Sequence, residues 1–133
     1  MEGIEWRSEL DMSLPKLWAR ESGIRGICLN LMMNAVQAMP SGGVLRVVTR
    51  ALPKQAEMII DDTGPGIAQE NLERIWEPFF TTKPAGQGTG LGLFVTQAIV
   101  SRNGGTIRAE NRSGGGARFT LRLRLDGTEG PPK

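Results

Sequence analysis

Apolar and polar residues alternate most regularly near the end of the chain, over Ala117–Leu125. A period of two places successive side chains on opposite faces of a strand. This segment therefore has one face for a core and one for solvent, which is typical of an antiparallel sheet. Four further segments are also predicted to be strands. These are Ile4–Leu10, Val44–Arg50, Met58–Asp61 and Thr106–Asn111.

Three segments follow a helical pattern. Between Gly23 and Met39, apolar residues recur at three- and four-residue spacing, and the run ends at a proline. A short helix is predicted over Gln69–Trp76 and a second long helix over Leu91–Arg102. Amphipathic helices and a one-sided sheet can bury their apolar faces only against each other. The sequence therefore predicts an α+β fold, a two-layer α/β sandwich in which a mixed, mostly antiparallel sheet of about five strands is covered on one face by three helices.

Length and composition limit the possible classes of function. The 133 residues fit one domain, predicted over 1–126, followed by a disordered tail over 127–133. The chain has no histidine, which excludes Ser-His-Asp and Cys-His nucleophile systems, a His-ligated metal and a phosphohistidine on this chain. The net charge of +2 gives no reason to expect nucleic acid as a partner. The single cysteine, Cys28, lies among apolar residues and is interpreted as a small buried hydrophobe.

The sequence also carries no sign of a membrane segment. No uncharged stretch is an apolar span of about 20 residues, and the first residues do not resemble a signal peptide. We therefore expect a soluble, cytoplasmic domain that makes no membrane contact of its own.

Two asparagines lie on the first long helix. Asn30 and Asn34 are four residues apart, so both side chains project from one face of a helix that is otherwise apolar there. Amides in an apolar neighbourhood need partners. The main chain could satisfy them. Alternatively, a side-chain oxygen could coordinate a hard cation such as Mg2+, which prefers oxygen ligands and usually brings phosphates with it.

A glycine-containing turn follows the Met58–Asp61 strand. Gly64 and Gly66 allow the backbone to turn sharply and a flat ligand to approach closely. The Asp62 carboxylate on this rim could accept a hydrogen bond from an exocyclic amine. A plain aspartate–glycine turn is the alternative interpretation of the same residues.

A glycine-rich loop runs directly into the second long helix, with glycines at 86, 88, 90 and 92. Free N–H groups and the positive end of the helix dipole suit a phosphate there. The spacing is not that of the dinucleotide fingerprint, and the Gly-Lys-Ser/Thr ending of a P-loop is missing. A flexible linker is the alternative, but linkers rarely carry leucine at alternate positions.

Two adjacent aromatic residues precede this loop. Phe79 and Phe80 cannot both enter one core easily, so one of them could be an exposed docking or lid residue. The alternative is that both simply pack. Lys83 opens the loop and could reach a phosphate.

In this order and at these spacings, four motifs resemble the N, G1, F and G2 boxes of the catalytic ATP-binding domain of sensor histidine kinases. The motifs are Asn30–Ala35, Asp62–Ile67, Glu77–Lys83 and Gly88–Leu93. This domain belongs to the GHKL superfamily of ATPases, so the resemblance implies a Bergerat fold. It covers about Ile4–Leu125, and the third motif looks like the nitrogen-regulation type of sensor kinase.

The resemblance implies a role for each matched residue, with ATP and Mg2+ as cofactors. Asn34 corresponds to the Mg2+ ligand, and Asn30 to a polar residue that helps to hold the triphosphate. Asp62 corresponds to the carboxylate that binds the adenine amino group. The other implied nucleotide-binding residues, in the base pocket and the ATP lid, are Gly64, Gly66, Ile67, Thr82, Lys83, Gly88, Thr89, Gly90, Leu91 and Gly92.

One position departs from the family pattern. The family often has a basic residue one turn beyond the Mg2+ ligand, and Gln37 stands there. Lys83 is therefore taken as the substitute phosphate contact and, with Asn34, as a catalytic residue. Phe79 and Phe80 correspond to aromatic positions that contact the histidine-bearing helices.

The resemblance implies a domain that binds Mg-ATP and positions its γ-phosphate for transfer to a histidine on a separate helical dimerisation hairpin. Because this chain has no histidine, it should not label itself, and the hairpin is expected to precede it in a full-length, perhaps membrane-anchored sensor. A response regulator is the expected partner of that full-length protein.

Three other functions stay open at this point. One is an ATP-gated conformational module of the mismatch-repair or gyrase type, which would carry a glutamate early in the first helix, where Asn30 stands. The second is a serine kinase that acts on an anti-sigma partner. The third is a degenerate nucleotide-binding domain that serves only as a scaffold.

Overall fold

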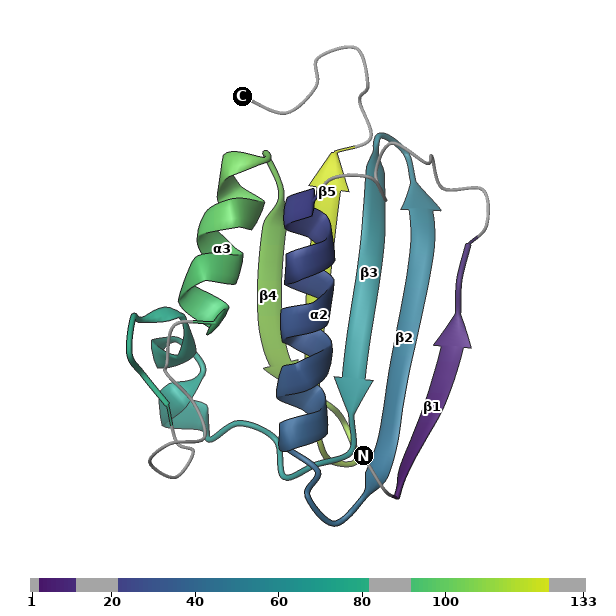
Figure 1. The fold of residues 1–133 in the computed structure, drawn as a ribbon, viewed down its shortest axis with the longest axis vertical. Coiled ribbons are helices and arrows are strands. Elements are labelled where there is room, and N and C mark those ends of the chain that lie inside the picture. The colour runs from purple at the N-terminus through teal and green to yellow at the C-terminus, as the bar shows by residue number, and fades with distance from the viewer. Residues whose placement is uncertain (1–2, 12–21, 82–91, 125–133) are drawn as a thin grey trace.

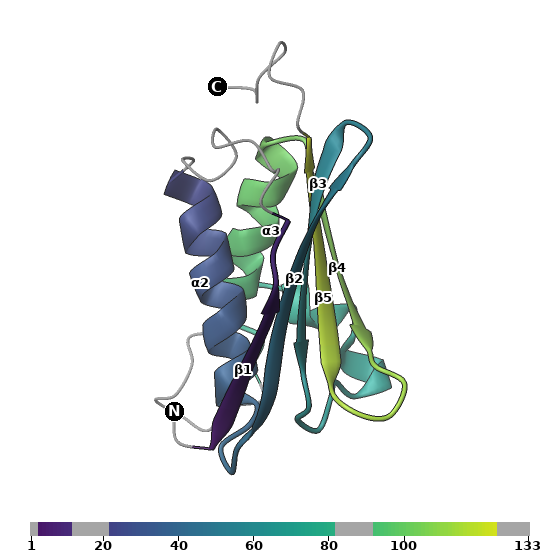
Figure 2. The same ribbon diagram turned by 90° about the vertical axis from the view of Figure 1, so that its right-hand side faces the viewer.

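The computed structural model describes residues 3–11, 22–81 and 92–124 of the chain, so the predicted tail over 127–133 lies outside it. In the described part, a five-stranded sheet carries two α-helices on one face (Figures 1 and 2). The elements are β1 (Ile4–Glu9), α2 (Ser22–Gln37), β2 (Gly43–Leu52), β3 (Gln55–Asp62), the 3-10 turns η1 (Gln69–Asn71) and η2 (Arg74–Trp76), α3 (Gly92–Arg102), β4 (Thr106–Asn111) and β5 (Ala117–Arg124). Neither α-helix is long and apolar enough to cross a membrane.

The strands follow the order β1-β2-β3-β5-β4 across the sheet. β1 pairs in parallel with β2, and all other neighbours are antiparallel. The predicted two-layer α+β sandwich with a mixed, mostly antiparallel sheet is therefore confirmed. β3 begins three residues earlier than predicted, because a tight turn through Lys54, with a φ of 68°, returns the chain at once from β2.

The number of helices differs from the prediction. The segment Gln69–Trp76 forms two separate 3-10 turns, η1 and η2, instead of one short α-helix. Neither turn has a side-chain hydrogen bond at its N-terminal cap. Eight residues closed by Pro78 are also too few to offset the cost of helix nucleation without such support.

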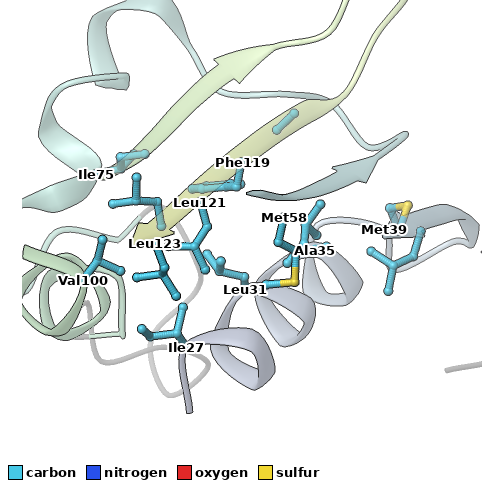
Figure 3. Close-up of a cluster of buried hydrophobic side chains, with 14 residues drawn as sticks. Ile27, Leu31, Ala35, Met39, Met58, Ile75, Val100, Phe119, Leu121 and Leu123 are labelled. Atoms are coloured by element: carbon cyan, nitrogen blue, oxygen red, sulfur yellow. The ribbon is translucent and has the colours of Figure 1, made fainter. Parts of the chain in front are cut away.

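The core lies between the helices and the sheet (Figure 3). The predicted stripe on α2 is confirmed at Ile27, Leu31 and Ala35, which are all buried. They pack with side chains from β3, β5 and α3, which include Met58, Ile60, Val100, Phe119, Leu121 and Leu123. Burial of each large aliphatic side chain contributes about 1.5–3 kcal/mol. This layer fixes α2, and with it both asparagines, against the sheet.

The opposite face of the sheet has no described helix over it, yet Val48 and Ile59 are each only 8% exposed there. They lie in one row of the sheet between two rows of charged side chains. These rows are Arg46, Asp61 and Arg118 on one side and Arg50, Glu57 and Arg122 on the other. Because arginine can lay its methylene stem over apolar surface while its guanidinium stays in water, the charged rows shield this aliphatic strip.

Candidate functional site

Most of the predicted site residues that the structure describes lie in one half of the molecule. β3 ends there with Asp62, and α2 ends beside it, as the lower half of Figure 1 shows. α3 begins in the same half, next to α2. The loop that leaves β3 passes close under the last turn of α2, since a Cβ atom on Gly64 would lie 2.6 Å from the carbonyl oxygen of Ala38.

The Asp62 carboxylate is buried, with 4% of the residue exposed. Its Oδ1 atom accepts hydrogen bonds from the main-chain N–H groups of Gly64, at 2.9 Å, and Ala117, at 3.2 Å. No residue in the described part of the chain donates to Oδ2. Burial raises the pKa of this carboxyl, while the two N–H groups and the nearby Arg112 act in the opposite direction. One oxygen is thus fixed by the fold, and the other can accept a hydrogen bond from a ligand.

Both glycines after Asp62 are required by the packing of their own loop. A side chain at Gly64 would meet Ala38, and one at Gly66 would lie 2.7 Å from Oδ1 of Asn111. Gly66 also has a φ of +82°, which side chains rarely adopt. The sequence interpretation gave these glycines a role in close approach of a ligand, and the structure adds this second, internal reason.

Asn30 connects the two helices. Its Nδ2 atom donates to the carbonyl oxygen of Gly92, at 2.9 Å, and to Oγ1 of Thr96, at 3.0 Å. Because a carbonyl can only accept, Oδ1 is the atom of this amide that remains as an acceptor. Gly92 must lack a side chain here, since a Cβ would lie 2.8 Å from Asn30 Oδ1. The sequence prediction did not include this structural role, which ties the start of α3 to α2.

Asn34 lies one helical turn further along α2 and is half-buried. The two asparagines thus share a helix face, as their spacing predicts. Asn30 is engaged with α3, and Asn34 lies nearer the end of α2 that overhangs the Asp62 loop.

The adjacent phenylalanines differ in environment. Phe79 is 72% exposed and has a φ of 69°, an unusual conformation for an aromatic residue. Phe80 is partly buried against the core, and the guanidinium of Arg74 lies 4.7 Å from its ring centroid. Of the two, Phe79 is therefore the one available to a partner.

Six predicted residues lie outside the described part of the chain. They are Thr82, Lys83, Gly88, Thr89, Gly90 and Leu91. Gly92 is the first described residue after them and begins α3.

The family assignment comes from the sequence itself. Residues 19–127 match the family described as "Histidine kinase-, DNA gyrase B-, and HSP90-like ATPase". The chain belongs to this family.

Proteins related to this ATPase domain include sensor kinases. The sensor histidine kinase ZraS of Escherichia coli O157:H7 is 39% identical over 130 residues, which are 98% of this chain and 28% of ZraS. The nucleotide-free catalytic domain of histidine kinase ThkA has a TM-score of 0.77 at 29% identity, over 92% of this chain and 80% of that one. Full-length ShkA in complex with AMPPNP has a TM-score of 0.78 at 31% identity, over 91% of this chain and 25% of ShkA. The chain thus spans less than a third of the curated relative.

The hairpin between β4 and β5 contributes groups around Asp62 that the sequence interpretation missed. Arg112 Nη1 donates to the carbonyl oxygen of Asp62, at 3.0 Å, and Ala117 donates to its side chain. Gly116, with a φ of +93°, packs directly on the main chain of Asp62. The run of three glycines at 114–116 was a signal, because it exceeds what a hairpin turn needs.

Proposed function

We propose that this chain is the catalytic domain of a two-component sensor histidine kinase and that it binds Mg-ATP. Asp62 Oδ2 would accept a hydrogen bond from the adenine amino group. The geometry of this carboxylate carries the proposal, because Oδ1 is already held by two main-chain donors and only Oδ2 is left for a ligand. A buried charge with one unused acceptor is costly unless a ligand donates to it.

The remaining roles follow the family pattern and are proposed with it. Asn34 would offer an amide oxygen to Mg2+, and Asn30 Oδ1 would face the triphosphate. Lys83 and the N–H groups from Gly88 to Gly92 would hold the β- and γ-phosphates. Ile67 and the two glycines of the loop would border the base. Phe79 would contact the histidine-bearing helices, with Phe80 behind it.

The donor set suits Mg2+ held mainly by the nucleotide. Among the described residues, no cluster of three or more histidine, cysteine, aspartate or glutamate side chains could hold a metal ion. Mg2+ is commonly bound through one or two protein oxygens plus phosphate oxygens and water. A single amide oxygen on α2 fits that pattern. The ion would neutralise charge on the phosphates when it is bound.

The acceptor must lie elsewhere, because the chain contains no histidine. We place it on a helical dimerisation hairpin of the same kinase. The full-length protein would then pass the phosphoryl group to a response regulator. In phosphoryl transfer the protein contributes mostly positioning and charge neutralisation, so a domain without a nucleophile can act as the catalytic half. As a domain that uses ATP as the donor, it would lie in the cytoplasm.

Transfer of label from γ-labelled ATP tests this function. The domain alone should stay unlabelled, and a separately supplied hairpin with its histidine should gain acid-labile phosphate. Asp62→Asn should weaken ATP binding roughly 10- to 150-fold, the range for a hydrogen bond to a charged group. Acid-stable label on this chain alone would contradict the proposal. Nucleotide-dependent dimerisation without transfer would favour the conformational module instead.

The metal role is tested separately. Asn34→Ala should remove most of the advantage that Mg2+ gives over EDTA in ATP binding, while adenosine binding barely changes. Asn103→Ala is a matched control, because the Asn103 amide donates to Ile99 near the end of α3. An unchanged Mg2+ dependence in Asn34→Ala would move the ligand elsewhere, with Asn30 the first candidate.

A further inference from the structure

The side chain of Asn111 is joined to the main chain of Ile67 by two hydrogen bonds. Oδ1 accepts from the Ile67 N–H, and Nδ2 donates to the Ile67 carbonyl oxygen, each at 2.7 Å. The amide thereby satisfies both main-chain polar groups of one loop residue, as a neighbouring strand would. Asn111 is the last residue of β4 and is 44 positions away from Ile67 in sequence.

This pair fixes one end of the loop that carries the adenine-binding geometry. The other end is Asp62, which is held by Ala117 N–H at its side chain and by Arg112 at its carbonyl oxygen. Both anchors come from β4, β5 and the turn between them. Only four residues separate Asp62 from Ile67, so fixing both ends leaves the loop few alternative paths.

Gly66, the residue before Ile67, packs closely against the side chain of Asn111. A Cβ atom on Gly66 would lie 2.7 Å from Oδ1 of Asn111, so the amide can reach Ile67 only because Gly66 has no side chain. Asn111 itself is exposed and contributes no apolar surface to the core cluster. Its two bonds therefore serve the loop and not the packing of the domain.

We propose that Asn111 is a positioning residue for adenine recognition, which holds Ile67 so that the 62–67 loop keeps Asp62 Oδ2 directed at the exocyclic amine of the base. The inference rests on the proposed function, because it requires Asp62 to bind adenine. Binding to a loop that is already ordered costs less conformational entropy than binding to one that must be ordered by the ligand. Removal of the Asn111 amide should thus lower affinity for adenine nucleotides without a change in any atom that touches them.

The test compares ATP with inosine triphosphate, which lacks the exocyclic amine, in wild type, Asn111→Ala, Asp62→Asn and the double variant. Asn111→Ala should weaken ATP binding roughly 5- to 10-fold, the scale of two exposed hydrogen bonds. Inosine triphosphate should change far less, so the preference for ATP falls. In the Asp62→Asn background, Asn111→Ala should have almost no further effect on ATP, because the contact that it positions is already lost.

Two further variants keep the result interpretable. Asn103→Ala removes another side-chain amide bond to the main chain, Nδ2 to the Ile99 oxygen at 2.8 Å, and should leave nucleotide preference unchanged. Asn111→Asp keeps the size and the acceptor for the Ile67 N–H but cannot donate to its carbonyl oxygen. It should also lower the preference for ATP, even if Asn111→Ala proves too unstable to measure.

The outcomes separate the two claims. If Asp62→Asn weakens ATP but Asn111→Ala leaves the ATP preference intact, or lowers both nucleotides equally, the positioning role is wrong and the proposed function stands. Additive effects in the double variant would also overturn it. If Asp62→Asn leaves ATP binding unchanged, the proposed function fails and the positioning role fails with it.

Discussion

Asp61 and Asp62 are neighbours in sequence, but their carboxylates lie on opposite faces of the sheet and are stabilised in opposite ways. Asp61, 2% exposed, is gripped by Arg118 through Nε at 2.7 Å and Nη2 at 2.9 Å. Arg46 and Arg112 lie a little further away, at 3.6 and 3.7 Å. Among the described residues, only main-chain N–H groups donate to the side chain of Asp62. One carboxylate is paired with arginine by the fold, and the other is the one proposed to accept a hydrogen bond from a ligand.

Neutralisation of Asp62 should stabilise the free protein while it weakens ATP binding. In Asp62→Asn, the amide oxygen can still accept from Gly64 and Ala117, but the buried charge is gone. Burial raises the pKa of the native carboxyl, so at pH 7 the charge lowers stability. That cost disappears as the pH falls through the raised native value. Urea unfolding without nucleotide should therefore show the variant more stable at pH 7, with the difference closing toward pH 4.

The same shift makes ATP binding sensitive to acid. Protonation of Asp62 would remove the acceptor proposed for the adenine amine. Because the pKa is raised, affinity should begin to fall at a higher pH than an ordinary carboxyl would give. Inosine triphosphate serves as the control. A parallel fall in both affinities would assign the pH dependence to the phosphates or to general unfolding.

Asp61 has the opposite role, and its loss should destabilise the domain. Asp61→Asn removes the counter-charge shared by three arginines, of which Arg46 keeps its pair with Glu9. We expect a loss of about 1–3 kcal/mol in the free energy of unfolding, below the full value for a buried pair because the arginines are partly exposed. Glu77→Gln is the comparison, since its pair with Arg74 is exposed on both sides at 3.9 Å and should contribute nothing measurable. Equal effects in the two variants would contradict this account.

The contrast between these carboxylates also shows what the sequence could predict. Helical spacing places Asn30 and Asn34 on one face, and alternation predicts which side chains of β5 face the core. Both predictions depend only on residues close together in the chain. The partners of Asp62 could not be predicted in this way. Ala117 lies 55 residues away and meets Asp62 only because β5 inserts between β3 and β4, an order that no local pattern encodes. The second bond of Asn30, to Thr96, depended likewise on how α2 and α3 dock.

Gly116 should be the least replaceable glycine of the β4–β5 hairpin. A Cβ there would collide with the carbonyl group of Asp62 and lie 3.0 Å from Cα of Thr63. Gly116→Ala should cost about 2–4 kcal/mol of stability and displace the Asp62 loop. Gly114→Ala provides a matched control, because Gly114 has a similar φ of 95° but nothing within 4 Å of its Cβ position. Thermal unfolding and ATP binding should be measured for both variants, and Gly116→Ala should show the larger loss. A similar loss of stability in both variants would mean that backbone strain alone, and not the contact with Asp62, explains the effect.

Cys28 should react slowly in the native protein. Burial raises its pKa to about 11, and its sulfur lies 3.8 Å from Sδ of Met58 on β3. At pH 8 the thiolate fraction should be about 100-fold below that of an ordinary exposed cysteine. Alkylation by iodoacetamide should be slow in buffer and fast in guanidinium chloride. A native rate close to the denatured rate would mean that the α2–β3 packing opens readily.

The direction of β1 decides which terminus of the domain lies beside the site. The β1–β2 pair is the one parallel pair of the described sheet, so the first residues of β1 lie where β2 begins (Figure 1). The Gly43 N–H donates to the Gly3 carbonyl oxygen, and a Cβ on Gly43 would lie 2.6 Å from Oγ1 of Thr63, the residue after Asp62. A segment joined ahead of Ile4 would leave the sheet next to the Asp62 loop, whereas one joined after Arg124 would leave from the far end. A tether that brings a phosphate acceptor to this domain is therefore shortest when it enters through β1.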